Sequence, residues 1–223
     1  INKFHFPENT VLTVLTIPSS ITRIDDFAFS GIKTLVYVKI PSSVTRIGNY
    51  AFRRCLSLED VSFEIPSSLK IIGTSAFNEC SSLKEIEIPS SVNIIDEAAF
   101  EDCASLKQIT LPHSLKSLEN FIFNECKSLM EISIPSTVIR IGNYALNGCI
   151  SLLKIEIPSS VTEIGEASFA GCSSLKQLII PSSVIKIGNY ALNECTSLLE
   201  ITIPSSLIST DFDIGSKVKI NKI

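Results

Sequence analysis

The sequence repeats itself every 23 residues, and this period constrains the fold more than any other feature. Nine prolines, each preceded by Ile or Leu, mark the same place in successive copies: Pro18, Pro41, Pro66, Pro89, Pro112, Pro135, Pro158, Pro181 and Pro204. All neighbouring prolines are 23 residues apart except Pro41 and Pro66, which are 25 apart. A unit this short cannot enclose a hydrophobic core alone, so its apolar residues must be buried against the next copy. The period therefore predicts a solenoid with one copy in each coil.

Other positions keep the same phase, and we number them by their distance from the proline. After Pro89, for example, Ile95 stands at +6, Phe100 at +11 and Leu106 at +17. Each unit reads approximately L-x-x-I-x-I-P-S-S-V-x-x-I-G-x-x-A-F-x-x-C-x-S. In one such unit, Ile86 and Ile88 are two residues apart. This spacing predicts a strand in which both side chains point to the same face of the sheet. The proline ends this strand because it lacks an amide donor.

The rest of the unit predicts short elements only. Residues 91–95 are expected to hold a second, shorter extended piece. A turn or a single helical turn should follow, with Gly48 supplying backbone freedom and the small Ala51 fitting where coils stack tightly. Long helices have no room. The two extra residues of the 25-residue spacing, Glu64 and Ile65, are expected as a bulge at a strand end, after Phe63.

The unit resembles the leucine-rich repeat of BspA-like, or Treponema pallidum-type, proteins, whose pattern is similar to L-x-x-L-x-L-P-x-S-L-x-x-I-G-x-x-A-F-x-x-C. The resemblance extends over about residues 12–207. It implies an α/β-type leucine-rich repeat solenoid dominated by β-structure. This would be a right-handed horseshoe of about nine repeats, with a parallel sheet on its concave side and few or no long helices. We expect a single domain over residues 1–223, with 208–223 as a C-terminal cap or linker, because Thr210 and Asp211 depart from the pattern.

Seven cysteines occupy one position of the repeat, +14: Cys55, Cys80, Cys103, Cys126, Cys149, Cys172 and Cys195. A metal site would need closely spaced cysteines or accompanying histidines, and neither is present. Neighbouring coils could bring two cysteines within reach of a disulfide, since adjacent strands lie about 4.8 Å apart. We expect instead a buried column of free thiols that act as small hydrophobic side chains, because Ile32 fills the same position in the first unit.

Composition and motifs exclude several classes of function. The formal net charge is −4, and no basic run is interleaved with aromatics, which argues against a nucleic-acid partner. Every apolar run is far shorter than the roughly 20 residues that span a bilayer, so we expect no membrane insertion. The only histidines, His5 and His113, do not converge with a Ser and an Asp into a catalytic triad. Phosphate-binding and dinucleotide motifs are absent, so we expect neither an enzyme nor a cofactor.

The strand alternation leaves positions +19 and +21 facing solvent on the expected concave sheet. Acidic residues are frequent at these positions in the middle of the chain, which makes this sheet the candidate for protein binding. The expected binding residues are Tyr37, Lys39, Asp60, Glu85, Glu87, Gln108, Glu131, Lys154, Glu156, Gln177 and Glu200. Basic residues gather instead at +4 and +5, on another flank, which would make the molecule electrically two-sided. These are Arg23, Arg46, Lys70, Lys116, Arg140 and Lys186.

The function expected from the repeat is a non-catalytic, protein-binding scaffold, because stacked repeats build an extended surface whose outward residues vary without disturbing the core. The BspA-like resemblance implies a cell-surface or secreted protein that adheres to host matrix or cell-surface proteins. The abundance of Asn, Ile, Lys and Ser would suit a protozoan parasite. The alternative is an intracellular, cytoplasmic scaffold or regulatory adaptor. It is consistent with the free thiols and with four Asn-x-Cys triplets but no Asn-x-Ser/Thr glycosylation site.

Overall fold

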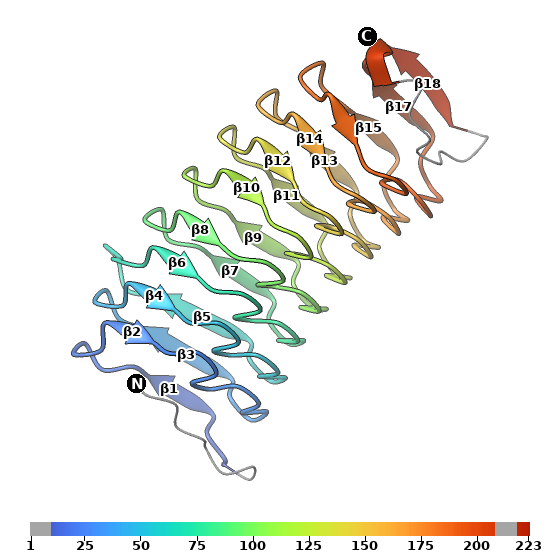
Figure 1. Ribbon diagram of the computed structural model, residues 1–223. Coiled ribbons are helices and arrows are strands. Elements are labelled where there is room, and N and C mark those ends of the chain that lie inside the picture. The colour runs from blue at the N-terminus through green and yellow to red at the C-terminus, as the bar shows by residue number, and fades with distance from the viewer. Residues whose placement is uncertain (1–9, 208–217) are drawn as a thin grey trace.

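The computed structural model describes residues 10–207 and 218–223. The coils follow one another along a single axis, and the first and last labelled strands, β1 (Val14–Thr16) and β18 (Lys219–Lys222), lie at opposite ends of the array (Figure 1). Within the described residues the only helical element is one 3₁₀ turn, η1 (Ser205–Leu207). The predicted solenoid of about nine coils without long helices is therefore confirmed. His5, Thr210 and Asp211 lie outside the described residues.

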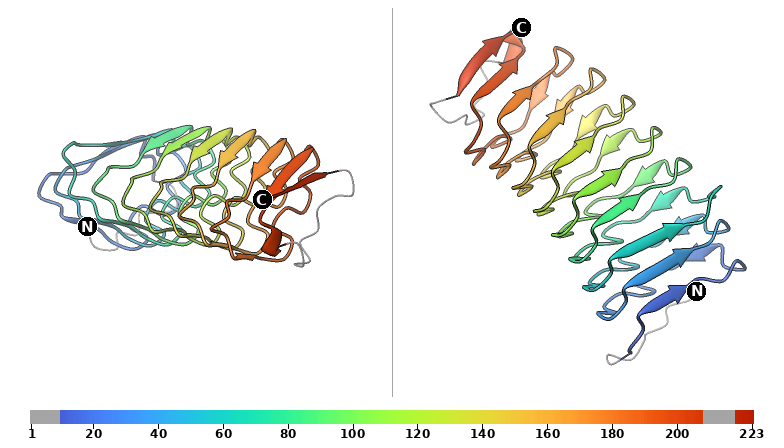
Figure 2. Two further views of the ribbon diagram at one scale, coloured as in Figure 1. Left: turned by 90° about the horizontal axis from the view of Figure 1, so that it is seen from above. Right: turned by 180° about the vertical axis from the view of Figure 1, so that it is seen from behind.

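Each coil contributes one strand of three or four residues to a parallel row, which we call the long-strand row. Its strands are β1 (Val14–Thr16), β3 (Tyr37–Ile40), β5 (Asp60–Phe63), β7 (Glu85–Glu87), β9 (Gln108–Thr110), β11 (Glu131–Ser133), β13 (Lys154–Glu156), β15 (Gln177–Ile179), β17 (Glu200–Ile203) and β18 (Lys219–Lys222). Equivalent residues of successive coils face each other, as Ile86 faces Ile109. Hydrogen-bonded pairing joins β1-β3-β5, β7-β9, β11-β13 and β15-β17-β18. Seen from behind, the row runs along the length of the array (Figure 2).

The second extended piece of each coil is a two-residue strand, and these strands form the short-strand row on the other side of the coils (Figures 1 and 2). They are β2 (Arg23–Ile24), β4 (Arg46–Ile47), β6 (Ile71–Ile72), β8 (Ile94–Ile95), β10 (Ser117–Leu118), β12 (Arg140–Ile141), β14 (Glu163–Ile164) and β16 (Lys186–Ile187). The extended piece expected over residues 91–95 is thus confirmed, although only its last two residues pair. The +6 residue that closes each strand is buried.

The core between the two rows is a set of columns that run along the axis. At +11 five phenylalanines stack face to face, with neighbouring ring centroids 5.2 to 5.9 Å apart: Phe29, Phe52, Phe77, Phe100 and Phe123. The stack ends at Leu146, which occupies the next place in the column and is also buried. Burial of an aromatic side chain of this size contributes about 2 to 3 kcal/mol. In the coils that carry phenylalanine at +11, this ring therefore contributes substantially to the cohesion between neighbouring coils.

The cysteine column is buried and all seven thiols are free, as the sequence predicted. Each thiol also donates a hydrogen bond to the +11 backbone carbonyl of the preceding coil, at 3.2 to 3.3 Å. Burial raises the pKa of Cys55 to about 12 and that of Cys195 to about 11, so both thiols stay protonated at neutral pH. The cysteines therefore link coils as well as filling space, which the sequence analysis did not foresee.

The glycine at +7 is required for a different reason from the one expected. A Cβ atom on Gly48 would lie 2.5 Å from the backbone nitrogen of Asp26 in the preceding coil, so only glycine fits between the two chains. The left-handed backbone occurs instead at +9 and +13, where Tyr50 has φ 57° and Arg54 has φ 60°. The expectation that Gly48 supplies backbone freedom was therefore wrong, because close approach of the preceding coil, and not a left-handed φ, excludes a side chain at Gly48.

The two inserted residues lie where the sequence placed them. Phe63 is the last residue of β5 that pairs with β3, opposite Ile40. Glu64 then donates its N–H to the Ile40 carbonyl at 3.0 Å, and the Ile65 side chain is 74% exposed. The extra pair therefore leaves the strand end as an exposed loop, and the coils on both sides keep their register.

Candidate protein-binding faces

The structure places all eleven predicted binding residues on the solvent side of the long-strand row. On β7, for example, Glu85 and Glu87 are exposed on either side of the buried Ile86. The others lie on β3, β5, β9, β11, β13, β15 and β17 with the same alternation. Tyr37 is partly buried, and its hydroxyl lies 2.6 Å from the Ser62 hydroxyl on the next strand. The predicted residues therefore form one continuous surface, which we call the long-strand face.

Four of these residues surround a depression in the middle of the long-strand face. Gln108, Glu131, Lys154 and Glu156 line a cavity of ≈ 580 Å³ across β9, β11 and β13, together with His113 from the turn after β9. The small side chains of Thr110 and Ser133 also line the cavity. The sequence analysis had weighed His113 only as a catalytic residue. His113 directly follows Pro112, the repeat proline after β9, and this place in the repeat was the sequence signal for its position beside the sheet.

Ion pairs neutralise only part of the acidic charge on the long-strand face. Glu64 from the inserted loop lies 2.9 Å from Lys39, and Glu156 lies 2.5 Å from Lys154. The hydrogen bond from Lys154 lowers the pKa of Glu156, and the same contact raises the pKa of Lys154. Among the described residues, four acids of the face have no ion-pair partner. They are Asp60, Glu85, Glu87 and Glu131.

The C-terminal strand β18 extends this face beyond the predicted residues. Lys219 lies opposite Glu200 and its ammonium is 2.9 Å from that carboxylate, while Asn221 also donates to Glu200 at 2.6 Å. The Lys219 hydrogen bond, with help from Asn221, lowers the pKa of Glu200. Sequence analysis missed these two residues because the segment 208–223 departs from the repeat. The alternation of Lys219, Ile220 and Asn221 was the available signal.

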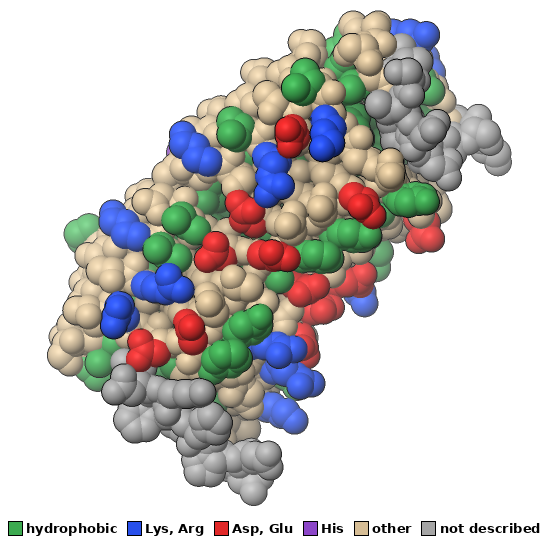
Figure 3. All heavy atoms as spheres, in the orientation of Figure 1, with side chains coloured by type: hydrophobic (Ala, Val, Ile, Leu, Met, Phe, Trp, Pro, Cys, Tyr) green, Lys and Arg blue, Asp and Glu red, His purple; other side chains and the backbone are tan. Residues whose placement is uncertain are grey.

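The basic residues expected on another flank lie on or next to the short-strand row. Acidic side chains at positions +7 and +8 follow these basic residues in the sequence. They include Asp25, Asp96, Glu119 and Glu166. Arg140 pairs with Glu119 at 3.1 Å. Figure 3 shows both signs of charge on this face. The expectation of an electrically two-sided molecule was therefore wrong, because the same period that aligns the cations also aligns acids next to them.

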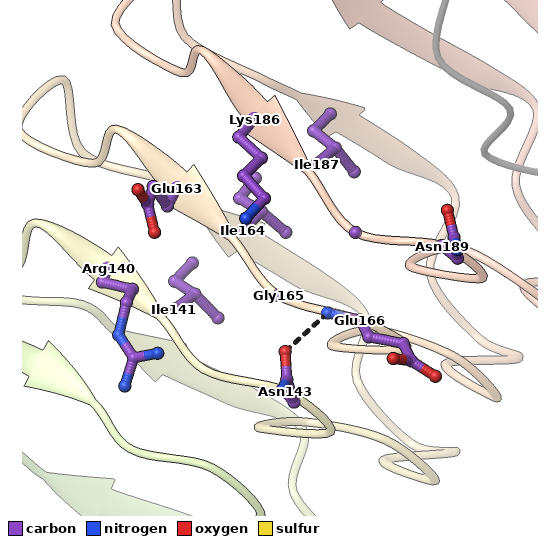
Figure 4. Close-up of a pocket in the computed structure, with 11 residues that line it drawn as sticks. Arg140, Ile141, Asn143, Glu163, Ile164, Gly165, Glu166, Lys186, Ile187 and Asn189 are labelled. Carbon is purple, nitrogen blue, oxygen red and sulfur yellow. Dashed lines mark hydrogen bonds between the residues drawn. The ribbon is translucent and has the colours of Figure 1, made fainter.

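A trough crosses the short-strand row near its C-terminal end, with a volume of ≈ 400 Å³. Its floor contains Gly165 and Gly188, and no side chain fills it there. One wall is formed by the +5 residues and the other by the +8 residues (Figure 4): Arg140, Glu163 and Lys186, and Asn143, Glu166 and Asn189. The Asn143 Oδ1 accepts the Glu166 N–H at 2.9 Å. The run of glycines at +7 in three successive coils was the sequence signal for this trough.

A ladder of polar side chains runs along the turns at +12. Arg53 donates to Asn78 at 3.0 Å, Asn78 donates to Glu101 at 3.0 Å, and Asn124 donates to the other Glu101 oxygen at 2.9 Å. Asn147 then donates to Asn124 at 2.7 Å. Partial burial, the largest influence, raises the pKa of Glu101. Three of the four Asn-x-Cys asparagines thus hold neighbouring coils together.

Neither a metal site nor a membrane-spanning helix is present in the described part of the chain. Residues 10–207 and 218–223 contain no group of three His, Cys, Asp or Glu side chains arranged to hold a metal ion. In the same ranges no helix is both long and apolar enough to cross a bilayer. The surfaces that remain as candidate sites are the long-strand face and the trough.

Comparison with solved structures shows the same solenoid elsewhere. A leucine-rich repeat protein from Bacteroides ovatus is 30% identical with a TM-score of 0.68; the match covers 94% of this chain and 60% of that one. The Treponema pallidum leucine-rich repeat protein is 27% identical with a TM-score of 0.61, over 83% of this chain and 77% of that one. The pneumococcal vaccine antigen PcpA shares the fold at 23% identity and a TM-score of 0.58, over 87% of this chain and 63% of that one. This chain thus spans about 60% of the length of the Bacteroides ovatus structure.

Sequence comparison gives the family. No curated protein matches the chain significantly. A protozoan origin stays a prediction. The family model for the BspA type leucine rich repeat region matches six copies, over residues 1–130 and 117–223. Leucine-rich repeat proteins are generally protein-binding scaffolds, because stacked repeats create an extended recognition surface. The chain belongs to the BspA-type leucine-rich repeat family.

Proposed function

We propose that this chain is the non-catalytic recognition part of a cell-surface protein and that the long-strand face binds a protein partner. The observation that carries the proposal is the set of acids on this face that have no ion-pair partner in the described residues: Asp60, Glu85, Glu87 and Glu131. Like charges at strand spacing repel one another, so a basic partner that neutralises them gains binding energy. Membership of the BspA-type family supports a surface location and a host matrix or cell-surface protein as the partner.

The central depression adds shape to this charge. It lies beside Glu131 and Glu156 and is wide enough to receive a side chain from a partner. Hot spots of protein interfaces concentrate where a side chain fills a pocket surrounded by other contacts. We therefore place the centre of the interface at β9, β11 and β13, with the acids of β5 and β7 attracting a basic surface.

The test is binding to a panel of purified extracellular-matrix proteins. Wild type is compared with Glu85→Lys/Glu87→Lys on the long-strand face and with Glu97→Lys/Glu194→Lys elsewhere, which changes the net charge equally. Glu97 and Glu194 are exposed and lie on turns. The proposal expects the face variant to lose about tenfold or more in affinity, and the control to stay within about twofold. Equal losses in both variants, or no binding of any panel protein, would count against it.

The second candidate is an intracellular scaffold or adaptor. The seven buried thiols favour it, since none is joined in a disulfide and disulfides are rare in the cytosol. Antibody labelling of intact and permeabilised source cells separates the two. Signal on intact cells supports the surface protein, whereas signal only after permeabilisation supports the scaffold.

A further inference from the structure

Two exposed apolar side chains lie next to each other at the start of β11 and β13. Met130 and Leu153 occupy +18, directly before the first strand residues Glu131 and Lys154, and are 45% and 56% exposed. The Leu153 N–H donates to the Met130 carbonyl at 3.0 Å, so the two residues are neighbours on successive coils. We call this pair the apolar ledge. Exposed apolar residues that stand together mark interaction sites, whereas scattered ones are ordinary surface.

Lysines border the ledge on both sides. At +18 the preceding coil has Lys107 and the following coil has Lys176, and both residues are exposed. Neither ammonium has an ion-pair partner among the described residues. Lys84, the equivalent residue one coil before Lys107, is different, because the Glu59 carboxylate lies 2.6 Å from its ammonium. The ledge is therefore an apolar pair between two cations whose charge no described residue neutralises.

The charge around the ledge is opposite in sign to that of β5 and β7. Glu131 and Glu156 line the depression that adjoins the ledge, and Lys154 pairs with Glu156 at 2.5 Å. Together with the two bordering lysines, these surroundings hold three cations and two acids, a net charge of +1. The acids of β5 and β7 have no ion-pair partner in the described chain. The long-strand face is therefore divided into an acidic part and a part that is apolar and weakly basic.

This combination of groups determines what can bind at the ledge. The flexible thioether of Met130 packs favourably against an aromatic ring, and aromatic residues supply much of the binding energy of protein interfaces. A lysine ammonium is a compact point charge that pairs with a carboxylate without a fixed geometry. Neighbouring coils are about 5 Å apart at the usual strand spacing, so a ring on the ledge brings the next residue of its chain within reach of a bordering lysine. The ledge therefore fits an aromatic residue next to an acidic one.

We propose that Met130 and Leu153 anchor an aromatic side chain of a partner protein, and that an acidic residue beside it pairs with Lys107 or Lys176. The inference rests on the proposed function, because it places the partner on the long-strand face. It adds an anchor that none of the eleven predicted residues provides. It also fixes the direction of the partner along the solenoid axis, with its aromatic and acidic end over β11 and β13 and its basic surface over β5 and β7. Electrostatic complementarity of this kind sets the register of an interface.

The first test uses three short peptides as probes: acetyl-Gly-Phe-Glu-Gly amide, acetyl-Gly-Phe-Lys-Gly amide and acetyl-Gly-Ala-Glu-Gly amide. Met130 is the only methionine of the chain, so labelling methionine methyl groups with carbon-13 gives one NMR signal, at the ledge. The Phe-Glu peptide should shift this signal saturably, with an affinity about fivefold or more above that of the other two peptides. Equal affinity of the Phe-Glu peptide and either of the others, or no shift of the signal, overturns the proposal.

The exposed position of the ledge allows variants that keep the fold, which circular dichroism checks. Leu153→Ser removes half of the ledge and should weaken the Phe-Glu peptide about threefold or more. Lys107→Gln/Lys176→Gln should abolish the preference for the Phe-Glu over the Phe-Lys peptide and keep the preference for Phe-Glu over Ala-Glu. Val36→Ser is the control, because Val36 is exposed at +18 near the other end of the row. It should bind like wild type, and a loss equal to that of Leu153→Ser would reject the ledge.

Two comparisons distinguish failure of the ledge from failure of the proposed function. Loss of matrix-protein binding in Glu85→Lys/Glu87→Lys, together with equal affinities of the three peptides, would support the proposed function and reject the ledge. A preference for the Phe-Glu peptide without binding of any panel protein would support the ledge and count against the proposed function. The Glu97→Lys/Glu194→Lys variant should bind the Phe-Glu peptide within about twofold of wild type. A larger gain there would show a response to overall charge, which also rejects the ledge.

Discussion

The Cys80 thiol donates a hydrogen bond to the Phe52 backbone carbonyl of the preceding coil at 3.2 Å. The same carbonyl accepts the Cys55 N–H of its own coil at 3.2 Å, so both of its acceptor sites are used. Because all seven cysteines repeat this contact, the column joins successive coils through buried polar groups. A buried carbonyl that loses one of its donors loses stability, since water cannot replace the bond there.

We therefore predict that Cys80→Ala lowers the free energy of unfolding by about 1 to 3 kcal/mol, measured by urea denaturation. The loss combines a missing donor with a small cavity. Cys195→Ala, near the end of the array, is the matched control and should cost less, because Cys195 is less deeply buried. A change below about 0.5 kcal/mol in Cys80→Ala would mean that the thiol contact does not contribute.

The phenylalanine stack gives the second prediction. Phe77 lies in the middle of the stack, 5.3 Å from Phe52 and 5.4 Å from Phe100. Phe77→Ala should cost about 3 to 5 kcal/mol, and Phe77→Leu markedly less, because the column already accepts leucine at Leu146. Phe27→Ala, at a partly exposed ring of the outer column, should cost less than Phe77→Ala. Equal losses at Phe77 and Phe27 in urea denaturation would contradict the central role of the stack.

The period of the sequence was enough to predict most of the fold. It determines which residues face each other in neighbouring coils, so the buried +6 and +11 columns and the cysteine column followed from the repeat. The strands followed from the alternation of Ile86 and Ile88, and the free state of the thiols from Ile32 in the same column. The position of the eleven outward residues followed from strand alternation, as at Glu85 and Glu87. Their role in binding stays a prediction, because the solvent side of a strand tolerates many residues for reasons other than recognition.

The turns could not be predicted in the same way. Their side-chain directions depend on left-handed residues at +9 and +13, and these positions hold Tyr50, Arg54 or Glu79 in place of glycine. No composition rule marks such residues as left-handed. The +12 ladder lies between these two left-handed positions of the turn. Sequence analysis therefore located the core and the long-strand face but missed the features on the turn side.

The close approach of the coils at +7 gives a third prediction. A Cβ on Gly165 would lie 2.5 Å from the Asn143 nitrogen and 2.5 Å from the Gly142 carbonyl carbon, both backbone atoms that cannot yield easily. Gly165→Ala should therefore destabilise the chain by about 1 to 3 kcal/mol in thermal or urea unfolding. Gly31→Asn is the control, because a Cβ there meets nothing within 4 Å and asparagine tolerates the left-handed backbone. If both substitutions prove equally mild, coil contact does not select the glycine.

The acids on the turn side give a prediction with a defined pH dependence. Burial, followed by repulsion from Glu125 and Glu79, raises the pKa of Asp102 above its ordinary value of 3.8. An acid whose pKa is higher in the folded state than in the unfolded state binds protons more readily when folded. Its contribution to stability is therefore most favourable at a pH below its unfolded value and is lost as the pH rises through its folded value.

Asp102→Asn removes this charge and keeps a side chain that suits the left-handed backbone at this position, where φ is 57°. The variant should be more stable than wild type at pH 7, by about 0.5 kcal/mol, because it removes a partly buried charge that Glu125 and Glu79 on neighbouring coils also repel. The gain should shrink toward pH 4 and vanish below it, because wild-type Asp102 is then protonated as well. Glu156→Gln should show the opposite effect on stability. The hydrogen bond from Lys154 lowers the pKa of Glu156, so the wild-type carboxylate stabilises the folded chain at a pH above its unfolded-state pKa, and the variant loses this stabilisation there. Urea unfolding of the three proteins from pH 3 to pH 7 checks both signs, and a gain for Asp102→Asn that does not change with pH would contradict the raised pKa of Asp102.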